Sequence, residues 1–130
     1  MVNTFPSLDQ DIFLNFPLRT LYREDLLPHN VQIIGNARGD SSVAEIRKTV
    51  DPHIGLKDEA ERAKYEEFWK IIHYVKGSVT SAEDMVKIDD ALKPIESGKT
   101  VANRLFYLAL PPSVYAATAK ALHASAMTKK

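Results

Sequence analysis

Hydrophobic and polar positions along the chain follow two alternating patterns. Short, continuously apolar runs predict buried strands of a parallel sheet at residues 31–35, 71–75 and 105–110. Longer stretches, in which apolar side chains recur every three or four residues, predict helices at residues 42–50, 58–71 and 113–127. Strands that alternate with helices in this way indicate an α/β fold with right-handed crossovers between parallel strands.

The run from Leu105 to Leu110 is the stretch around which the chain is organised. It is continuously apolar and aromatic, which predicts a fully buried strand. Pro111 and Pro112 follow it and suit a rigid loop that leads into the first turn of the next helix. Because ligands of open α/β sheets bind beyond the carboxyl ends of the strands, this junction is a candidate functional site. The alternative is a core strand followed by a stiff turn.

Local signals mark the ends of the helices and their buried faces. Ser42 with Glu45 matches a capping box, which predicts the start of the first helix. A further helix is expected to begin at Thr80 or Ser81, with Pro94 and Gly98 closing it. The helix at 58–71 carries an aromatic stripe that we interpret as core, formed by Tyr65, Phe68 and Trp69.

The first 20 residues show no regular pattern, and we interpret residues 1–20 as an irregular or inserted segment. Ile12–Phe16 is a short strand candidate, because Pro6 and Pro17 bracket it too closely for a useful helix. Residues 18–27 form a weak helical candidate. A chain of 130 residues forms one domain at most.

Composition narrows the classes of function. The 17 Lys and Arg residues balance the 17 Asp and Glu residues, so no field of one sign is available to hold nucleic acid or an anionic membrane. The chain has no cysteine, and its four scattered histidines show no metal-ligand spacing. No apolar run approaches the roughly 20 residues that span a bilayer. We therefore expect a soluble, cytoplasmic protein without a metal site.

Arg38 is the most specific single candidate for binding. It follows the predicted strand 31–35, at a position where dinucleotide-binding units read the adenosine ribose, and an arginine there accommodates the extra phosphate of NADP. The Ser41-Ser42 helix start beside it also suits an anion. The alternative is a solvated surface arginine, and the nearby Asp40 weakens the anion interpretation.

Two further observations limit the chemistry. The sequence contains no G-x-G-x-x-G motif, so the Gly-rich turn that grips a pyrophosphate is missing. His73 lies in a predicted strand, where a core histidine that donates to a backbone group is the favoured interpretation over a catalytic base. We identify no catalytic residue.

Four blocks of sequence resemble the coenzyme domain of glucose-6-phosphate dehydrogenases in order and spacing: residues 21–28, 34–38, 74–77 and, above all, the NRLFYLALPPSVY block at 103–115. The resemblance implies a partial NADP-binding domain over residues 21–130. It further implies that Arg38 contacts the adenosine phosphate of NADP and that Tyr115, after Pro111 and Pro112, lies near the coenzyme. Asn36 stands where the family usually has tyrosine.

Departures from the family pattern shape the expected fold and activity. The family's first strand and Gly-Ala-Ser-Gly-Asp-Leu-Ala turn are not recognisable here, so we expect an incomplete Rossmann-like, doubly wound parallel sheet that lacks both. Removing a central strand is expected to split the sheet, unless Ile12–Phe16 replaces it. In the family, the residues that bind glucose 6-phosphate and the general-base histidine come later in the sequence than the part that this 130-residue chain resembles.

Three functional interpretations remain at this stage. By resemblance, the family reaction is the NADP-dependent oxidation of glucose 6-phosphate in the pentose phosphate pathway, which this chain is expected not to perform alone. The chain is alternatively a non-catalytic fragment that binds NADP weakly or associates with intact family subunits. A third interpretation is that the chain is the product of an incomplete or misread gene, in which residues 9–20 are translated intron.

Overall fold

The structure, a computed structural model, describes residues 2–4 and 18–127. Its centre is a four-stranded parallel sheet with the order β3-β2-β1-β4. The strands are β1 (Val2–Thr4), β2 (Ile33–Ala37), β3 (Ile72–Lys76) and β4 (Phe106–Leu108). The α/β class with a parallel sheet is therefore confirmed.

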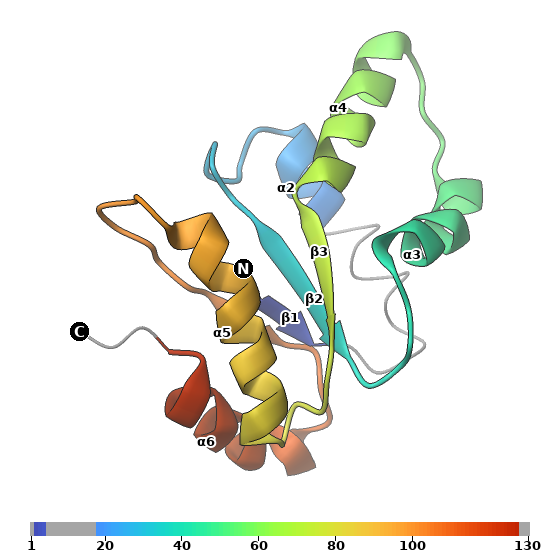
Figure 1. Cartoon of the computed structure of the whole chain (residues 1–130). Coiled ribbons are helices and arrows are strands. Elements are labelled where there is room, and N and C mark those ends of the chain that lie inside the picture. Colours follow the sequence, from blue (N-terminus) through green and yellow to red (C-terminus); the bar gives the residue numbers. More distant parts are fainter. Residues whose placement is uncertain (1, 5–17, 128–130) are drawn as a thin grey trace.

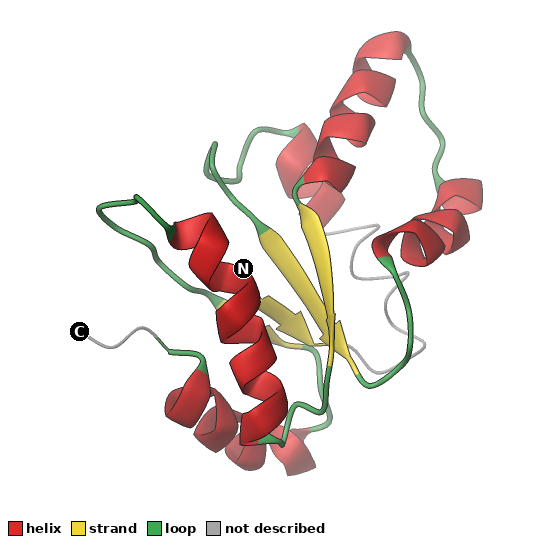
Figure 2. Cartoon of the chain, in the orientation of Figure 1, coloured by secondary structure: helices red, strands yellow, loops and turns green. Residues whose placement is uncertain are grey.

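Helices cover both faces of this sheet (Figure 2). One face carries α2 (Arg19–Arg23), α3 (Val43–Val50) and α4 (Glu59–Lys70). The other face carries α5 (Ala82–Glu96) and α6 (Tyr115–Ser125). Two short 3-10 turns, η2 (Asp51–His53) and η3 (Pro112–Val114), complete the described elements. None of the described helices has the length and apolar composition needed to cross a membrane.

Neighbouring residues of β2 serve two separate hydrophobic cores. Ile33 and Ile34 are both fully buried, and because side chains alternate along a strand they point to opposite faces. Ile33 joins the core under α2, α3 and α4, in which the predicted aromatic stripe of α4 is buried. Ile34 joins the core under α5 and α6. β2 thus contributes to both cores, as does β3, whose Ile72 joins the first core and whose Val75 packs against the second.

Two predicted helix starts, at Ser42 and Ser81, are confirmed by cap hydrogen bonds. The Ser42 Oγ accepts from the Glu45 backbone N–H at 3.2 Å and donates to the Glu45 carboxylate. Ser81 caps α5 in the same way, through the backbone N–H of Asp84. Such caps satisfy backbone donors that a helix leaves unpaired in its first turn.

The prediction that the first strand is missing was wrong. Val2–Thr4 form β1, which pairs in parallel with β2 on one side and with β4 on the other. Asn3, for example, is in register with Gly35 and with Tyr107. The sheet is therefore not split. Sequence patterns missed β1 because three residues carry too little periodicity to identify a strand. The alternative strand at Ile12–Phe16 lies outside the described residues.

The prediction of a fully buried strand at Leu105–Leu110 was also wrong. β4 spans only three residues and lies at the end of the strand order, so one of its edges has no strand neighbour in the described chain. Leu105 is 61% exposed and Tyr107 is 45% exposed, whereas Phe106 and Leu108 pack towards the core of α5 and α6. An edge strand with one covered face produces this alternation.

Smaller boundaries also differ from the prediction. β2 begins and ends two residues later than the predicted strand 31–35. The helix predicted at 18–27 ends at Arg23. Pro94 lies inside α5 instead of closing it, and the positive φ of Gly98 (77°) follows the end of that helix. In each case the type of element was predicted correctly and only its boundaries differ.

Candidate functional site

The carboxyl ends of the parallel strands meet at one edge of the sheet (Figure 1). Arg38 is the first residue after β2, and Lys76 is the last residue of the neighbouring β3. The first turns of α5 return to the same edge and contribute Asp84 and Lys87. These residues line a cavity of about 410 Å³ together with Gly77 and Ser78.

The cavity carries three cationic side chains and one carboxylate. Asp84 accepts hydrogen bonds from the Lys87 ammonium at 2.5 Å and from the Ser78 backbone N–H at 2.9 Å. The hydrogen bond from Lys87, followed by the one from Ser78, lowers the pKa of the Asp84 carboxyl. Asp84 is therefore ionised and already engaged, and its charge is balanced by Lys87.

Arg38 remains available to a ligand. It is exposed, and within the described part of the chain it has no ion pair, hydrogen bond or cation–π contact. Asp40, which weakened the anion interpretation of the sequence, places its carboxylate 3.2 Å from the Lys76 ammonium. Because that carboxylate is matched by Lys76, the charge of Arg38 is not cancelled within the cavity. The edge of the sheet at β2 thus presents a guanidinium that no described residue pairs with.

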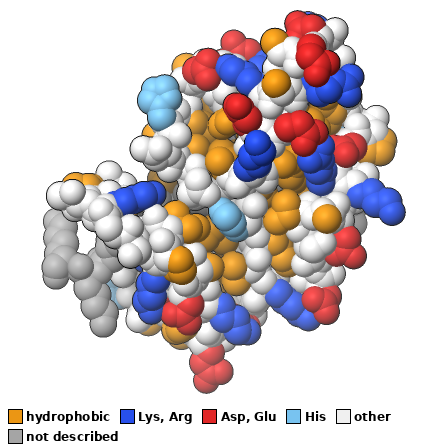
Figure 3. Space-filling model, turned by 45° about the horizontal axis from the view of Figure 1, so that its top comes forward, with side chains coloured by type: hydrophobic (Ala, Val, Ile, Leu, Met, Phe, Trp, Pro, Cys, Tyr) orange, Lys and Arg blue, Asp and Glu red, His pale blue; other side chains and the backbone are white. Residues whose placement is uncertain are grey.

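This positive cavity is a local feature on a mixed surface. In Figure 3 the Lys and Arg side chains alternate with Asp and Glu, and neither sign forms a continuous patch on the face shown. That distribution agrees with the formal net charge of zero. Any anion bound at Arg38 is therefore held by short-range contacts, since the protein offers little long-range steering field.

A buried amide lies beneath this edge. Asn36 in β2 is fully buried, and its side-chain Nδ2 donates to the Val75 carbonyl of β3 at 2.8 Å. Its Oδ1 has no hydrogen-bond partner among the described residues. The contact ties β2 to β3 directly before the two strand ends that carry Arg38 and Lys76.

Gly77 is expected to be required for the shape of the cavity. A Cβ atom at this position would lie 2.9 Å from the Cβ of Asp84, which is too close for real atoms, and α5 would have to move. Gly77→Ala should therefore lower the free energy of unfolding by about 1–3 kcal/mol, the usual cost of overpacking. Chemical denaturation of the two proteins measures this difference.

Gly55→Ala is the matched control for Gly77→Ala, because no atom lies within 4 Å of the Cβ that it adds. It should leave the stability unchanged or raise it slightly, since alanine reduces the freedom of the unfolded chain. Equal effects of the two substitutions would contradict the close contact between Gly77 and α5.

The other predicted binding residues lie at the same edge of the sheet but not in this cavity. Pro111 and Pro112 follow β4, and Tyr115 is the exposed first residue of α6. β1 separates β4 from β2, and the cavity around Arg38 is lined by none of these three residues. The structure does not bring them together with Arg38, and their role in coenzyme binding stays a prediction.

His73 has a different partner from the one predicted. Its Nε2 lies 2.8 Å from the Oε1 of the Gln32 side chain, so the contact is not with a backbone group. The described residues contain no group of three or more His, Asp or Glu side chains that could hold a metal ion.

The sequence analysis did not identify Lys76, Ser78 and Lys87 as parts of the site. The position of Lys76 and Ser78 after the end of a predicted strand is a signal that could have indicated them, because the carboxyl ends of two adjacent parallel strands meet at one edge. That signal requires knowing that β2 and β3 are neighbours, which the residue pattern alone does not give.

A cavity larger than the one around Arg38 lies at the opposite edge. It measures about 560 Å³ and is formed by the loops before β2 and β4 together with the end of α5. Ligands of open parallel sheets bind at the carboxyl ends of the strands, whereas this cavity lies where two strands begin. We therefore place the candidate site at Arg38 and not in the larger cavity.

Comparison with known proteins agrees with this architecture. Residues 14–130 match the family described as "Glucose-6-phosphate dehydrogenase, NAD binding domain". The chain belongs to the glucose-6-phosphate dehydrogenase family. The glucose-6-phosphate 1-dehydrogenase of Culex pipiens is 42% identical to this family member over 95 residues, which are 73% of this chain and 61% of that protein.

The region of similarity is a small part of some glucose-6-phosphate dehydrogenase relatives. The Ceratitis capitata protein of the same name is 40% identical over 95 residues, and the match spans only 18% of its length. A solved structure, "Glucose-6-phosphate dehydrogenase in complex with its substrate glucose-6-phosphate", superposes with a TM-score of 0.83 at 30% identity. That superposition covers 98% of this chain and 28% of the other.

Proposed function

We propose that this chain is a coenzyme-binding domain of the glucose-6-phosphate dehydrogenase family and that the edge at Arg38 binds NADP. The observation that carries the proposal is the exposed guanidinium of Arg38, which has no partner among the described residues and lies directly after β2 in a cavity that Lys76 also lines. The strand order β3-β2-β1-β4 supports it, because dinucleotide-binding units use this order and read the adenosine ribose at the end of the second strand.

The charges of the cavity fit a phosphorylated ribose better than a free one. Arginine binds phosphate oxygens through parallel N–H donors, and such charge-assisted hydrogen bonds are stronger than neutral ones. NAD offers neutral ribose hydroxyls at the same place, for which an acidic residue is the usual partner. The carboxylates near Arg38 are already engaged, Asp40 by Lys76 and Asp84 by Lys87. We therefore infer a preference for NADP over NAD.

The 130-residue chain alone is proposed not to oxidise glucose 6-phosphate. NADP, when bound, supplies a hydride acceptor, but the reaction also needs a group that takes the hydroxyl proton of the sugar. Among the described residues, Asp84 is the one carboxylate that lines the cavity, and its lowered pKa and two hydrogen bonds make it a poor base. We infer that other parts of a family enzyme supply the base and the contacts to glucose 6-phosphate.

Calorimetric titration of the purified chain with NADP and with NAD tests the coenzyme proposal. NADP is expected to bind at least about tenfold more tightly than NAD, which corresponds to about 1.4 kcal/mol. Equal affinities, or tighter binding of NAD, would contradict the proposed role of the guanidinium. Incubation with NADP and glucose 6-phosphate should form no NADPH, and measurable turnover would overturn the proposal of inactivity.

The alternative of association with an intact family subunit stays a prediction. Co-purification of the chain with a full-length family enzyme tests it.

A further inference from the structure

Arg38 lies on a short turn that is held by a side chain of the neighbouring strand. Tyr74 lies in the middle of β3, in register with Gly35 of β2. Its hydroxyl donates to the Gly39 carbonyl at 2.6 Å and also lies within 3.3 Å of the Ala37 carbonyl. These are the carbonyls of the residues immediately before and after Arg38, so one phenol group spans the turn that presents the guanidinium.

The two carbonyls differ in the number of other hydrogen bonds that they accept. The Ala37 carbonyl already accepts the Gly77 backbone N–H at 2.9 Å, as part of the pairing of β2 with β3. Within the described part of the chain, the Tyr74 hydroxyl is the one donor to the Gly39 carbonyl. Gly39 also has the widest backbone freedom of any residue type. The far side of the turn therefore depends on Tyr74 for its anchor.

The ring of Tyr74 is itself well anchored. It is partly buried and packs against the core formed under α2, α3 and α4. Burial, and secondly the negative charge of Asp40, raise the pKa of the Tyr74 hydroxyl. The phenol consequently keeps its proton at neutral pH and can donate to the turn. A rigid aromatic ring with a protonated hydroxyl is a suitable fixed point for a flexible loop.

We propose that Tyr74 is a positioning residue that holds the turn at Ala37–Gly39 so that Arg38 meets the ribose phosphate of the coenzyme. The inference rests on the proposed function, because it assigns Tyr74 to the discrimination between a phosphorylated and an unphosphorylated ribose. Binding is tighter when the receptor loop is ordered beforehand, since less conformational entropy is lost on association. Tyr74 acts through Arg38 and touches no reacting atom.

Tyr74→Phe removes only the hydroxyl and tests this role. The probes are adenosine 2′,5′-bisphosphate, which carries the ribose phosphate, and ADP, which does not. Affinity for the bisphosphate should fall about three- to tenfold, the range expected for the loss of one hydrogen bond. Affinity for ADP should be unchanged. An unchanged affinity for the bisphosphate, or an equal fall for both probes, would overturn the positioning role.

Tyr22→Phe is the matched control. Tyr22 is also a partly buried tyrosine of the same core, with its ring 5.4 Å from that of Phe68, and no hydrogen bond of its hydroxyl is found within the described residues. It should leave both affinities unchanged. A loss of bisphosphate affinity in Tyr22→Phe would show that general loosening of this core, and not the anchor at Gly39, controls binding.

A measurement without ligand separates this inference from the proposed function. If the unaltered chain binds no bisphosphate, the proposed function fails, and amide hydrogen exchange of the turn decides the role of Tyr74. Faster exchange at Arg38, Gly39 and Asp40 in Tyr74→Phe, with unchanged exchange in the centre of β2, would establish the anchor. Unchanged exchange at the turn would overturn it.

Discussion

Arg104→Ala is expected to lower the free energy of unfolding by about 3–5 kcal/mol, the range seen when one member of a buried ion-pair network is removed. That range is a large fraction of the roughly 5–15 kcal/mol that stabilises a typical domain. We therefore expect the variant to unfold at a much lower denaturant concentration, or to be unfolded at 37 °C. Chemical denaturation followed by circular dichroism measures the effect.

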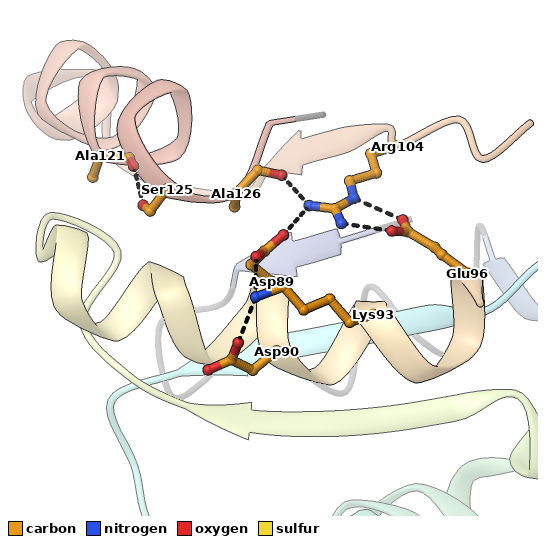
Figure 4. A network of polar contacts seen from close by, with 8 residues as sticks. All are labelled: Asp89, Asp90, Lys93, Glu96, Arg104, Ala121, Ser125 and Ala126. Carbon is orange, nitrogen blue, oxygen red and sulfur yellow. Dashed lines mark hydrogen bonds and ion pairs between the residues drawn. The ribbon is translucent and has the colours of Figure 1, made fainter. Parts of the chain in front are cut away.

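The contacts of Arg104 explain this large expected effect (Figure 4). Its side chain is only 7% exposed, and its guanidinium pairs with Asp89 at 2.7 Å and with Glu96 at 2.6 Å, both on α5. It also donates to the Ala126 carbonyl at the end of α6. Arg104, in the loop before β4, thus joins both helices of its layer. Its removal leaves the largely covered Glu96 carboxylate without a counter-charge and leaves Asp89 with Lys93 alone.

The pH dependence of the stability loss in Arg104→Ala distinguishes the loss of ion pairs from the loss of packing. Burial raises the pKa of the Asp89 carboxyl, but hydrogen bonds from Lys93 and Arg104 outweigh it, and the net pKa is lowered. A carboxyl with a lowered pKa stabilises the fold above its unfolded pKa of about 3.9 and loses this effect as the pH falls through its folded value. The difference between the original chain and Arg104→Ala should therefore shrink in acid. A difference independent of pH would indicate packing alone.

Arg62→Ala is the control for Arg104→Ala. Arg62 also pairs with a carboxylate, that of Glu59 at 3.6 Å, but its side chain is 61% exposed. Exposed ion pairs contribute about 0–1 kcal/mol because water and salt screen them. Comparable losses in the two variants would contradict the assignment of Arg104 as a buried hub.

Arg38→Gln is expected to weaken NADP binding about ten- to a hundredfold, since hydrogen bonds to charged groups contribute about 1.5–3 kcal/mol. The affinity for NAD should not change, because NAD has no ribose phosphate for the guanidinium to contact. The substitution removes the charge and the forked guanidinium donors but keeps a polar side chain with two N–H donors. Arg38 is exposed and has no intramolecular partner in the described chain, so the stability of the fold should also be unaffected.

Arg62→Gln controls for the loss of one positive charge from the surface, and it should leave NADP affinity unchanged. Titrations at two salt concentrations add a second check, because a contact with phosphate weakens as salt rises. Equal losses of affinity for NADP and NAD in Arg38→Gln would mean that Arg38 maintains the shape of the site but makes no contact with the ribose phosphate.

Much of the fold could be predicted from local sequence because its signals are strong. Ser42 and Ser81 mark helix starts through hydrogen bonds that depend on near neighbours only. The aromatic stripe of α4 is buried as its spacing indicated. The misassigned strands are those whose state depends on tertiary context. β1 is too short for a pattern, and β4 is apolar yet lies at an edge.

The candidate site was predictable only at the residue that follows a recognisable strand. Arg38 could be singled out because its chemistry and its position after β2 point to the same ligand. Tyr74 and Lys76 belong to a different strand, and their relation to Arg38 arises from the pairing of β2 with β3. From a single sequence, a tyrosine in a predicted strand is interpreted as a core residue. Its hydrogen bond to the Gly39 carbonyl can be identified only from the structure.

The most direct test of the claim that NADP binds at the carboxyl ends of the strands is to titrate the ¹⁵N-labelled chain with NADP and follow the amide chemical shifts. If the claim is correct, the largest shift changes occur at the residues that line the cavity there, Arg38, Lys76, Gly77 and Ser78. Residues around the larger cavity at the opposite edge, such as Asn30 and Gly98, should not shift. Shifts gathered around Asn30 and Gly98, or none at any position with millimolar NADP, would contradict the account.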